Sequence, residues 1–263
     1  MTLEVKDLAF SYRKNSPVFR SVNFSLRDGD ILSVLGANGI GKSTLLNCLA
    51  GLFRPSEGDI LLNGQSIYAM SRAELARQVG YVPQLHGSSF AYSVLECAVM
   101  GRAPYIRPYA SPSKADYDIA RDSLRRVGLA GMENRIFTEL SGGEQQLTVI
   151  ARVLAQQPRV ILLDEPANHL DYGNRYRLLG LLRTLAGDGH CIITTTHDPN
   201  HVLALGGAAA VSDGGSFRTG AVSDIITADT LSRLYGTPIG LTYLADAGRR
   251  LCYTEPKEQH GEV

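Results

Sequence analysis

The stretch "ILSVLGANGIGKSTLLNCLAGL", from Ile31 to Leu52, joins an apolar strand pattern to a glycine-rich loop and then to an apolar helix pattern. Its middle fits G-x-x-x-x-G-K-[ST], a pattern in which backbone N–H groups wrap phosphates where a strand meets a helix. In this pattern Lys42 reaches the β and γ phosphates, and the Ser43 hydroxyl can hold Mg²⁺. We therefore expect a nucleotide phosphate site. Its residues are Gly36, Ala37, Asn38, Gly39, Ile40, Gly41, Lys42, Ser43 and Thr44.

Strand and helix patterns alternate beyond this loop. "RVILLD" and "HCIITTTH" are typical of buried strands, and a helical pattern from Tyr172 to Gly187 separates them. Such alternation predicts an α/β fold in which a mostly parallel sheet is covered by helices. Ahead of the loop, alternating apolar and polar residues around a turn at Asp28-Gly29 predict an antiparallel β part at one edge.

The helical patterns of residues 88–139, such as "SKADYDIARDSLRRVGL", predict a helical insertion in this α/β fold. We expect one domain over residues 1–263, with its core in residues 1–87 and 140–240 and a helical subdomain in residues 88–139. Residues 241–263 fit no motif and are expected to form a C-terminal tail. The last dozen residues are polar and are expected to be mobile.

Composition restricts the class of protein. Lys+Arg and Asp+Glu are both 26, so no basic excess favours a nucleic-acid partner. The four cysteines form no C-x-x-C pair and are expected to be free structural residues. The N-terminus lacks the pattern of a signal peptide, and no apolar run approaches the ~20 residues that a membrane span needs. We expect a soluble protein whose membrane role, if any, comes through a partner.

A second motif, "VILLDEP", ends a buried strand with two acidic residues. Asp164 follows the strand at the edge where a carboxylate could hold Mg²⁺ through a water molecule. Glu165 is next in the chain and is expected to face an attacking water. An acidic pair behind an apolar strand in a chain with a phosphate loop predicts a nucleotide hydrolase.

A third motif, "LSGGEQQ", begins at Leu140 and places a second glycine pair at a helix start, where free N–H groups favour anions. Together with "GANGIGKST" and "ILLDEP", it makes nearly the whole chain resemble the ATP-binding subunits of ABC transporters. In that family two subunits pair head to tail, and the signature of one closes on the ATP of the other. The resemblance thus implies an ATP hydrolase that uses Mg²⁺. It assigns the partner's ATP to Ser141, Gly142, Gly143 and Glu144.

The resemblance implies a role for each of four further residues. Tyr12 in "FSY" matches the aromatic residue that stacks on adenine, and Gln84 in "YVPQ" matches the glutamine that reaches Mg²⁺ and the attacking water. Asp171 in "HLD" matches the aspartate that crosses the dimer interface. His197 in "TTTHD" matches the histidine that contacts the γ-phosphate. Glu165, His197 and Gln84 are therefore the expected catalytic residues, and Ser43, Gln84 and Asp164 the expected metal ligands.

The stretches "MGRAPY" and "TTTHDPNHV" are similar to the importer ATPases for iron–siderophore, haem, cobalamin and related molybdate systems. This similarity implies separate membrane permease subunits, an external substrate-binding protein, and a location on the inner face of the cell membrane. The permease is expected to dock on the helical subdomain, with Tyr92 and Val94 as test positions.

The sequence leaves alternatives open. "DEPANHLD" resembles the "DEPTNHLD" of soluble ABC proteins that act on ribosomes, although this chain lacks their second ATPase domain and charged linker. An exporter subunit is a second alternative. His197 and His201 form H-x-x-x-H, which could be read as a metal pair, but no third ligand is evident.

Overall fold

The computed structural model describes residues 1–13, 16–84, 91–168, 170–213 and 215–254. Its centre is a six-stranded sheet with the order β10-β9-β3-β8-β7-β6. Neighbouring strands from β9 to β6 run parallel, and β10 is antiparallel to β9. These strands are β3 (Ile31–Leu35), β6 (Val79–Val82), β7 (Val160–Leu163), β8 (Cys191–Thr196), β9 (Ala208–Asp213) and β10 (Ser216–Ala221).

Strand β7 is apolar at every position because both faces of the sheet are covered. Successive side chains of a strand point to opposite faces. Ile161 and Leu163 join an apolar cluster on one face, whereas Val160 and Leu162 join a cluster on the other. The sequence prediction of an α/β fold with a mostly parallel buried sheet is thereby confirmed.

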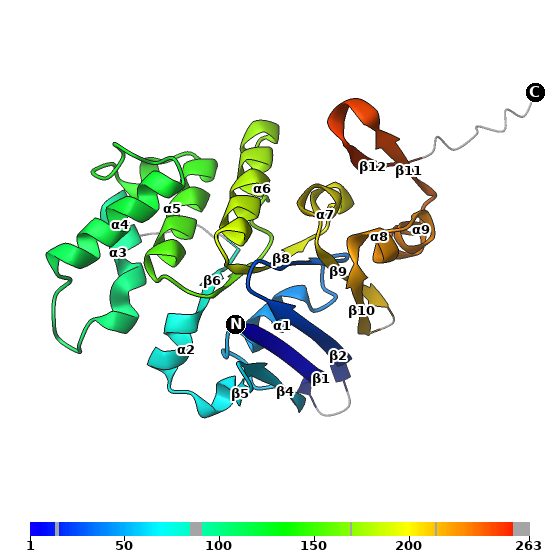
Figure 1. The fold of residues 1–263 in the computed structure, drawn as a ribbon, viewed down its shortest axis with the longest axis horizontal. Coiled ribbons are helices and arrows are strands. Elements are labelled where there is room, and N and C mark those ends of the chain that lie inside the picture. Colours follow the sequence, from blue (N-terminus) through cyan, green and yellow to red (C-terminus); the bar gives the residue numbers. More distant parts are fainter. Residues whose placement is uncertain (14–15, 85–90, 169, 214, 255–263) are drawn as a thin grey trace, which may run out of the picture.

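Different elements cover the two faces of the central sheet (Figure 1). Helices α5 (Gly142–Ala155) and α6 (Tyr172–Gly187) supply buried residues to the cluster of Ile161 and Leu163. Helix α1 (Lys42–Leu49) and an antiparallel sheet supply those of the other cluster. The antiparallel sheet has the order β2-β1-β4-β5. Its strands are β1 (Thr2–Arg13), β2 (Ser16–Arg27), β4 (Glu57–Leu62) and β5 (Gln65–Ser66), and the expected turn at Asp28-Gly29 follows β2.

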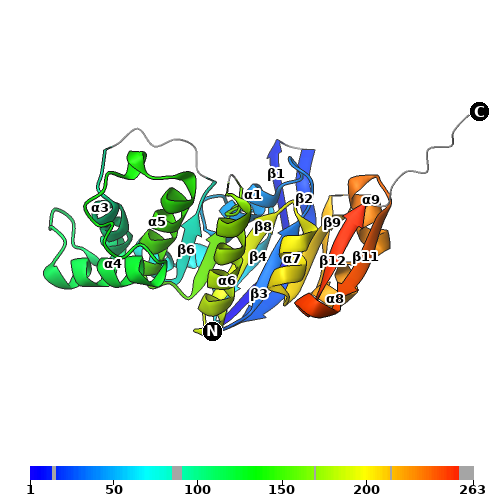
Figure 2. The same ribbon diagram turned by 90° about the horizontal axis from the view of Figure 1, so that it is seen from above.

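Short helices gather at one end of the molecule, beside α5 (Figure 2). They are α3 (Val94–Val99), η2 (Met100–Tyr105), α4 (Lys114–Arg126) and the 3₁₀ turn η3 (Phe137–Glu139). Two further elements, η1 (Ile67–Ala69) and α2 (Arg72–Gln78), lie between β5 and β6 in the chain. Four helices begin with a capping box, in which the serine side chain accepts the N–H of an acidic residue three positions later and the acidic side chain accepts the N–H of the serine. These pairs are Ser71/Glu74, Ser93/Glu96, Ser113/Asp116 and Ser141/Glu144.

The "MGRAPY" stretch forms the 3₁₀ helix η2, which joins the helical region to the core. A Cβ on Gly101 would come within 1.9 Å of the Arg152 carbonyl oxygen, so the chain needs glycine there. Buried Arg102 donates to Asp116 at 3.1 Å and to the Ala155 carbonyl at 2.8 Å. The same guanidinium lies 4.0 Å from the centre of the Tyr105 ring. This packing gives the motif a structural role.

The segment after residue 240 differs from the tail that the sequence suggested. Strand β11 (Ile239–Leu244) and strand β12 (Arg249–Thr254) form an antiparallel hairpin through the 3₁₀ turn η4 (Ala245–Ala247). Residues 252–254 belong to β12, so the expectation of a mobile tail is wrong for them, and residues 255–263 lie outside the described part. Helices α7 (Pro199–Leu205), α8 (Val222–Ile225) and α9 (Ala228–Tyr235) complete this end of the molecule.

The four cysteines lie at different depths in the fold. Cys48 and Cys191 are buried, Cys97 and Cys252 are partly buried, and all four are free thiols. Across the described ranges, no helix combines the length and the apolar character that crossing a membrane requires.

Candidate functional site

The phosphate loop connects β3 to α1, as the sequence motif requires. Gly41 caps α1 with φ of 98°, in the left-handed region that disfavours residues with a side chain. A Cβ at this position would also meet the Val18 side chain at 2.5 Å. Both observations explain why the loop needs glycine where it enters the helix. The N–H groups in the first turn of α1 have no partners inside the helix, as at any helix start, and can bind an anion.

Lys42 is buried at the first position of α1, and protein oxygens hold its ammonium group. Its Nζ lies 2.7 Å from the Gly36 carbonyl oxygen and 3.1 Å from that of Ala37. Glu165 Oε1 accepts the third contact at 2.9 Å. These three acceptors match the three protons of an ammonium group. A phosphate that binds Lys42 would therefore replace one of them.

The acidic residues after β7 occupy two different environments. Asp164 is 4% exposed, accepts a hydrogen bond from Thr195 Oγ1 at 2.7 Å, and lies 3.5 Å from the Tyr81 hydroxyl. Glu165 has φ of 45°, and its N–H donates to Thr195 Oγ1 at 2.8 Å. The turned backbone sends the Glu165 side chain toward Lys42, while the Asp164 carboxylate lies between Tyr81 of β6 and Thr195 of β8.

Glu165 is the centre of a polar cluster at the carboxyl ends of the parallel strands. His197 Nδ1, just after β8, lies 3.0 Å from Glu165 Oε2, and Asn168 Nδ2 donates to the same oxygen. Burial alone would raise the pKa of Glu165, but hydrogen bonds from Lys42, Asn168 and His197 outweigh it and lower the pKa. The Glu165 carboxylate is therefore ionised at neutral pH and can accept a proton or orient a water.

A cavity of about 490 Å³ opens beside this cluster. It is lined by residues of the loop and the start of α1, of β1 and β2, and of the segments that follow β6 and β7: Tyr12, Val18, Asn38, Gly39, Gly41, Lys42, Ser43, Thr44, Gln84, Glu165 and Asn168. The structure thus brings Tyr12, Gln84 and Glu165 to the phosphate loop, as the sequence predicts. The Tyr12 ring is 64% exposed, and its hydroxyl lies 3.0 Å from Thr44 Oγ1.

The signature residues lie apart from this cavity. None of Ser141, Gly142, Gly143 and Glu144 is among its lining residues. Ser141 caps α5, and its N–H and hydroxyl both lie 2.8 Å from Glu144 Oε2. A Cβ on Gly143 would approach the Asn174 amide at 3.1 Å, and Asn174 in turn donates to Asp171, which caps α6. The signature and Asp171 therefore adjoin each other at the starts of α5 and α6.

Several site residues escape sequence reasoning. Thr195 holds Asp164 and the Glu165 N–H, Tyr81 approaches Asp164, and Asn168 holds the Glu165 carboxylate. Thr195 comes two residues before His197, and Asn168 comes three residues after Glu165. Their closeness in sequence to these motif residues is a signal from which a place in the site could be predicted. Tyr81 lies on β6, and only the pairing of β6 with β7 places it there.

His201 does not form a metal site with His197. Its Nδ1 lies 3.2 Å from Thr196 Oγ1 and its Nε2 lies 3.3 Å from Asp198, inside the packing of α7. Among the described residues, no group of three or more histidine, cysteine or acidic side chains could hold a metal ion.

Comparisons with known proteins agree with the three motifs. A family model described as ABC transporter matches residues 19–168. The chain is 40% identical over 238 residues to the molybdate import ATP-binding protein MolC of Haemophilus influenzae, covering 90% of this chain and 89% of that protein. It is 35% identical over 246 residues to the hemin import ATP-binding protein HmuV of Bordetella pertussis, covering 90% and 92%.

A solved structure of a metal-chelate type ABC transporter in an inward-facing conformation superposes with a TM-score of 0.86 at 36% identity. The superposition covers 97% of this chain and 98% of that one. Sequence motifs, strand-end geometry and these likenesses all lead to one assignment. The chain belongs to the ABC transporter family, as an ATP-binding and ATP-hydrolysing subunit.

Proposed function

We propose that the chain powers import through a separate membrane permease, by hydrolysing ATP at interfaces between two of its copies. The observation that carries this proposal is that the nucleotide cavity and the signature lie apart within one chain. Lys42 and Glu165 line the nucleotide cavity, whereas the anion-binding signature at Ser141 lines none of it. A second copy, paired head to tail, would bring its signature to this cavity.

In this proposal Gly36 to Thr44 wrap the phosphates, Lys42 exchanges Glu165 for a phosphate oxygen, and the exposed Tyr12 ring stacks on adenine. The residues around Asp164 suit Mg²⁺, because a buried carboxylate, a hydroxyl and an amide supply the hard oxygen ligands that it prefers. Ser43, Gln84 and Asp164 would hold the ion, Asp164 through water. When bound, Mg²⁺ neutralises charge on the phosphates.

Glu165 would then be free of Lys42 and would orient or deprotonate the attacking water, while His197 contacts the γ-phosphate. Ser141, Gly142, Gly143 and Glu144 of the second copy would face that phosphate, and Asp171 would cross the interface between copies. The closeness of the two groups supports pairing them in one interface, because Asn174 lies beside Gly143 and donates to Asp171.

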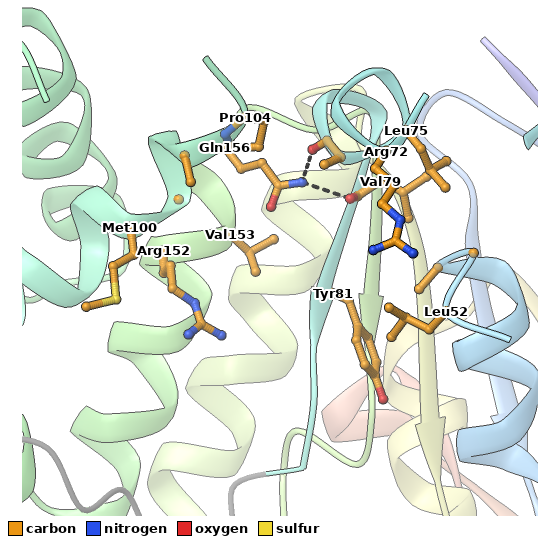
Figure 3. Close-up of a pocket in the computed structure, with 15 residues that line it drawn as sticks. Leu52, Arg72, Leu75, Val79, Tyr81, Met100, Pro104, Arg152, Val153 and Gln156 are labelled. Atoms are coloured by element: carbon orange, nitrogen blue, oxygen red, sulfur yellow. Dashed lines mark hydrogen bonds between the residues drawn. The ribbon is translucent and has the colours of Figure 1, made fainter. Parts of the chain in front are cut away.

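We further propose that the permease docks in a groove between the core and the helical region (Figure 3). This groove has a volume of about 690 Å³. Leu52 and Leu75 lie on one side and Met100 and Val153 on the other. Leu52 is 63% exposed and Met100 is 40% exposed, so the rim offers apolar side chains to a partner. Gln156 bridges the sides by donating to the carbonyls of Ala76 and Val79.

Docking in this groove is tested better at its exposed rim than at Tyr92 and Val94. Tyr92 is 43% exposed, but Val94 is fully buried in the helical region. A charge at Val94 would disrupt the core, so its use as a docking position was wrong. Leu52→Asp or Met100→Asp should instead abolish transport with the permease while ATP binding persists. Leu244→Asp, at an exposed leucine of the C-terminal hairpin, is the matched control, and equal effects of all three would refute docking in this groove.

The proposal of import draws on the names of the relatives, which are import proteins for molybdate, hemin and cobalamin. These names favour an importer over an exporter or a ribosome-acting protein. By the same likeness, the cargo is an iron chelate, haem, cobalamin or molybdate-type oxyanion, delivered by an external binding protein. The chain would lie in the cytoplasm, against the inner face of the membrane.

Light scattering of the Glu165→Gln variant, with and without ATP and Mg²⁺, tests the paired-copy proposal. Slow hydrolysis should let ATP accumulate in the interface and should double the measured mass. Adding Ser141→Arg should prevent this, because it places bulk and charge where the partner's phosphate would sit. A dimer that forms equally well without ATP, or that survives Ser141→Arg, would contradict the proposal.

A further inference from the structure

Tyr235, the last residue of helix α9, contacts the backbone of His197, the residue that follows β8. The Tyr235 hydroxyl donates to the His197 carbonyl oxygen at 2.6 Å, across 38 residues of sequence. We propose that Tyr235 is a positioning residue for His197 in ATP hydrolysis. This inference rests on the proposed function, in which His197 contacts the γ-phosphate.

Tyr235 is suited to hold a fixed point. Its ring packs against the apolar cluster that contains Val202 of α7 and Leu231 of α9, so the hydroxyl is carried by a packed side chain. Burial, followed by the nearby Asp198 and Cys252, raises the pKa of the Tyr235 hydroxyl above its usual value. The hydroxyl therefore remains a hydrogen-bond donor throughout the pH range in which the enzyme would work.

A second contact attaches the same C-terminal segment just beyond His197. Asn200 Oδ1 accepts the Cys252 N–H at 2.9 Å, and its amide nitrogen approaches the Cys252 carbonyl at 3.4 Å. Strand β12 thus lies along α7, as Figure 2 shows. The Arg249 guanidinium also lies 4.9 Å from the centre of the Tyr176 ring on α6. Residues 228–254 therefore contact α7 and α6, which begin next to His197 and Asp171.

The position of His197 explains why such support matters. Its side chain is 51% exposed, and its Nδ1 is 3.0 Å from Glu165. Packing around an exposed imidazole restrains it little, so the direction of the ring depends on the Glu165 contact and on the backbone that carries it. The Tyr235 hydrogen bond restrains that backbone at the carbonyl of the same residue. Losing it would let the imidazole drift from the phosphate without removing any group that binds ATP.

The test uses the full-length protein and the Tyr235→Phe variant, which removes one oxygen and keeps the ring. A typical hydrogen bond of about 1 kcal/mol corresponds to about a fivefold fall in kcat, and KM for ATP should stay near the wild-type value. Tyr243→Phe removes the hydroxyl of an exposed tyrosine in β11 and is the matched control. His197→Ala and the double variant Tyr235→Phe/His197→Ala complete a cycle that isolates the coupling.

The inference predicts that the double variant is no slower than His197→Ala, because Tyr235 acts through the imidazole. It also predicts that the ¹⁵N resonance of the His197 ring, assigned through His197→Ala, shifts in Tyr235→Phe but not in Tyr243→Phe. If Tyr235→Phe slows the His197→Ala background about fivefold as well, its role is merely structural and the inference fails. If His197→Ala slows turnover but Tyr235→Phe does not, the inference alone fails. Wild-type turnover in His197→Ala overturns the role of His197 in the proposed function, and the inference with it.

Discussion

Replacing Glu165 with glutamine should change nucleotide affinity as well as turnover. Glu165 Oε1 holds the Lys42 ammonium at 2.9 Å, and a phosphate oxygen has to displace it. A hydrogen bond between charged groups contributes about 1.5–3 kcal/mol, whereas one to a neutral amide contributes about 1 kcal/mol. The competing contact should therefore weaken by about 1 kcal/mol, and the carboxylate no longer repels the phosphate. We expect ATP to bind about tenfold more tightly, since about 1.4 kcal/mol is a factor of ten.

Isothermal titration with Mg²⁺ and a non-hydrolysable ATP analogue measures this difference. Placing Ser141→Arg in every protein keeps dimerisation out of the titration. Glu4→Gln is the control, because it removes one carboxylate that pairs with a lysine, Lys6, at 2.8 Å on strand β1. Its affinity should match that of the wild type. If Glu165→Gln binds no more tightly than this control, Glu165 does not compete with phosphate for Lys42. Turnover of Glu165→Gln should fall roughly 10²-fold or more, the usual contribution of a general base.

Three further predictions follow from charged contacts in the structure. Glu144 accepts hydrogen bonds from the Ser141 N–H and hydroxyl at 2.8 Å. The neutral amide of Glu144→Gln would hold these donors less tightly and leave them freer to bind the partner's phosphate, so ATP-dependent dimerisation should need about fivefold less protein. Light scattering that shows weaker dimerisation would contradict this. Arg102→Ala removes a buried guanidinium that donates to the Ala155 carbonyl and to Asp116, and should reduce the free energy of unfolding in urea by about 3 kcal/mol. Arg121→Ala breaks an exposed pair and should cost about 0.5 kcal/mol or less, so equal losses would refute the distinction. Because the native pKa of Glu165 is lowered, its stabilisation is complete above its ordinary value of 4.5 and is lost as pH falls through the native value. Melting temperatures of wild type and Glu165→Gln, without nucleotide, should therefore differ at pH 7 and converge in acid, and a constant difference would contradict this.

The sequence predicts the nucleotide cavity well because its parts are short and local. The loop is one continuous motif, and Glu165 and His197 each follow an apolar strand. Parallel strands bring their carboxyl ends to one edge of a sheet, so recognising the strands is enough to predict that these residues meet. The order of the strands does not indicate which side chain pairs with Glu165, so the ion pair with Lys42 is seen only in the structure.

What the sequence misses depends on contacts between distant segments. The β11–β12 hairpin lacks a long apolar alternation, because both strands are six residues long and are mostly exposed or only partly buried. Its position follows from Asn200, and the contact of Tyr235 with His197 spans 38 residues. Val94 illustrates the opposite error, since a short apolar helix gives no sign in sequence of which side is covered. In the structure it is fully buried.

The most direct test of a site shared between two copies is complementation between two inactive variants. Lys42→Ala should lose ATP binding and Ser141→Arg should lose action on the partner's ATP, so each alone should lack ATPase activity. In a mixed dimer both lesions would fall on one interface and leave the other intact. When the permease holds two copies together whether or not ATP binds, random pairing of equal amounts should restore roughly a quarter of the wild-type rate, since about half of the dimers are mixed and each has one intact interface. If the mixture stays as inactive as its components although mixed dimers form, Ser141 does not act on the ATP of a second copy.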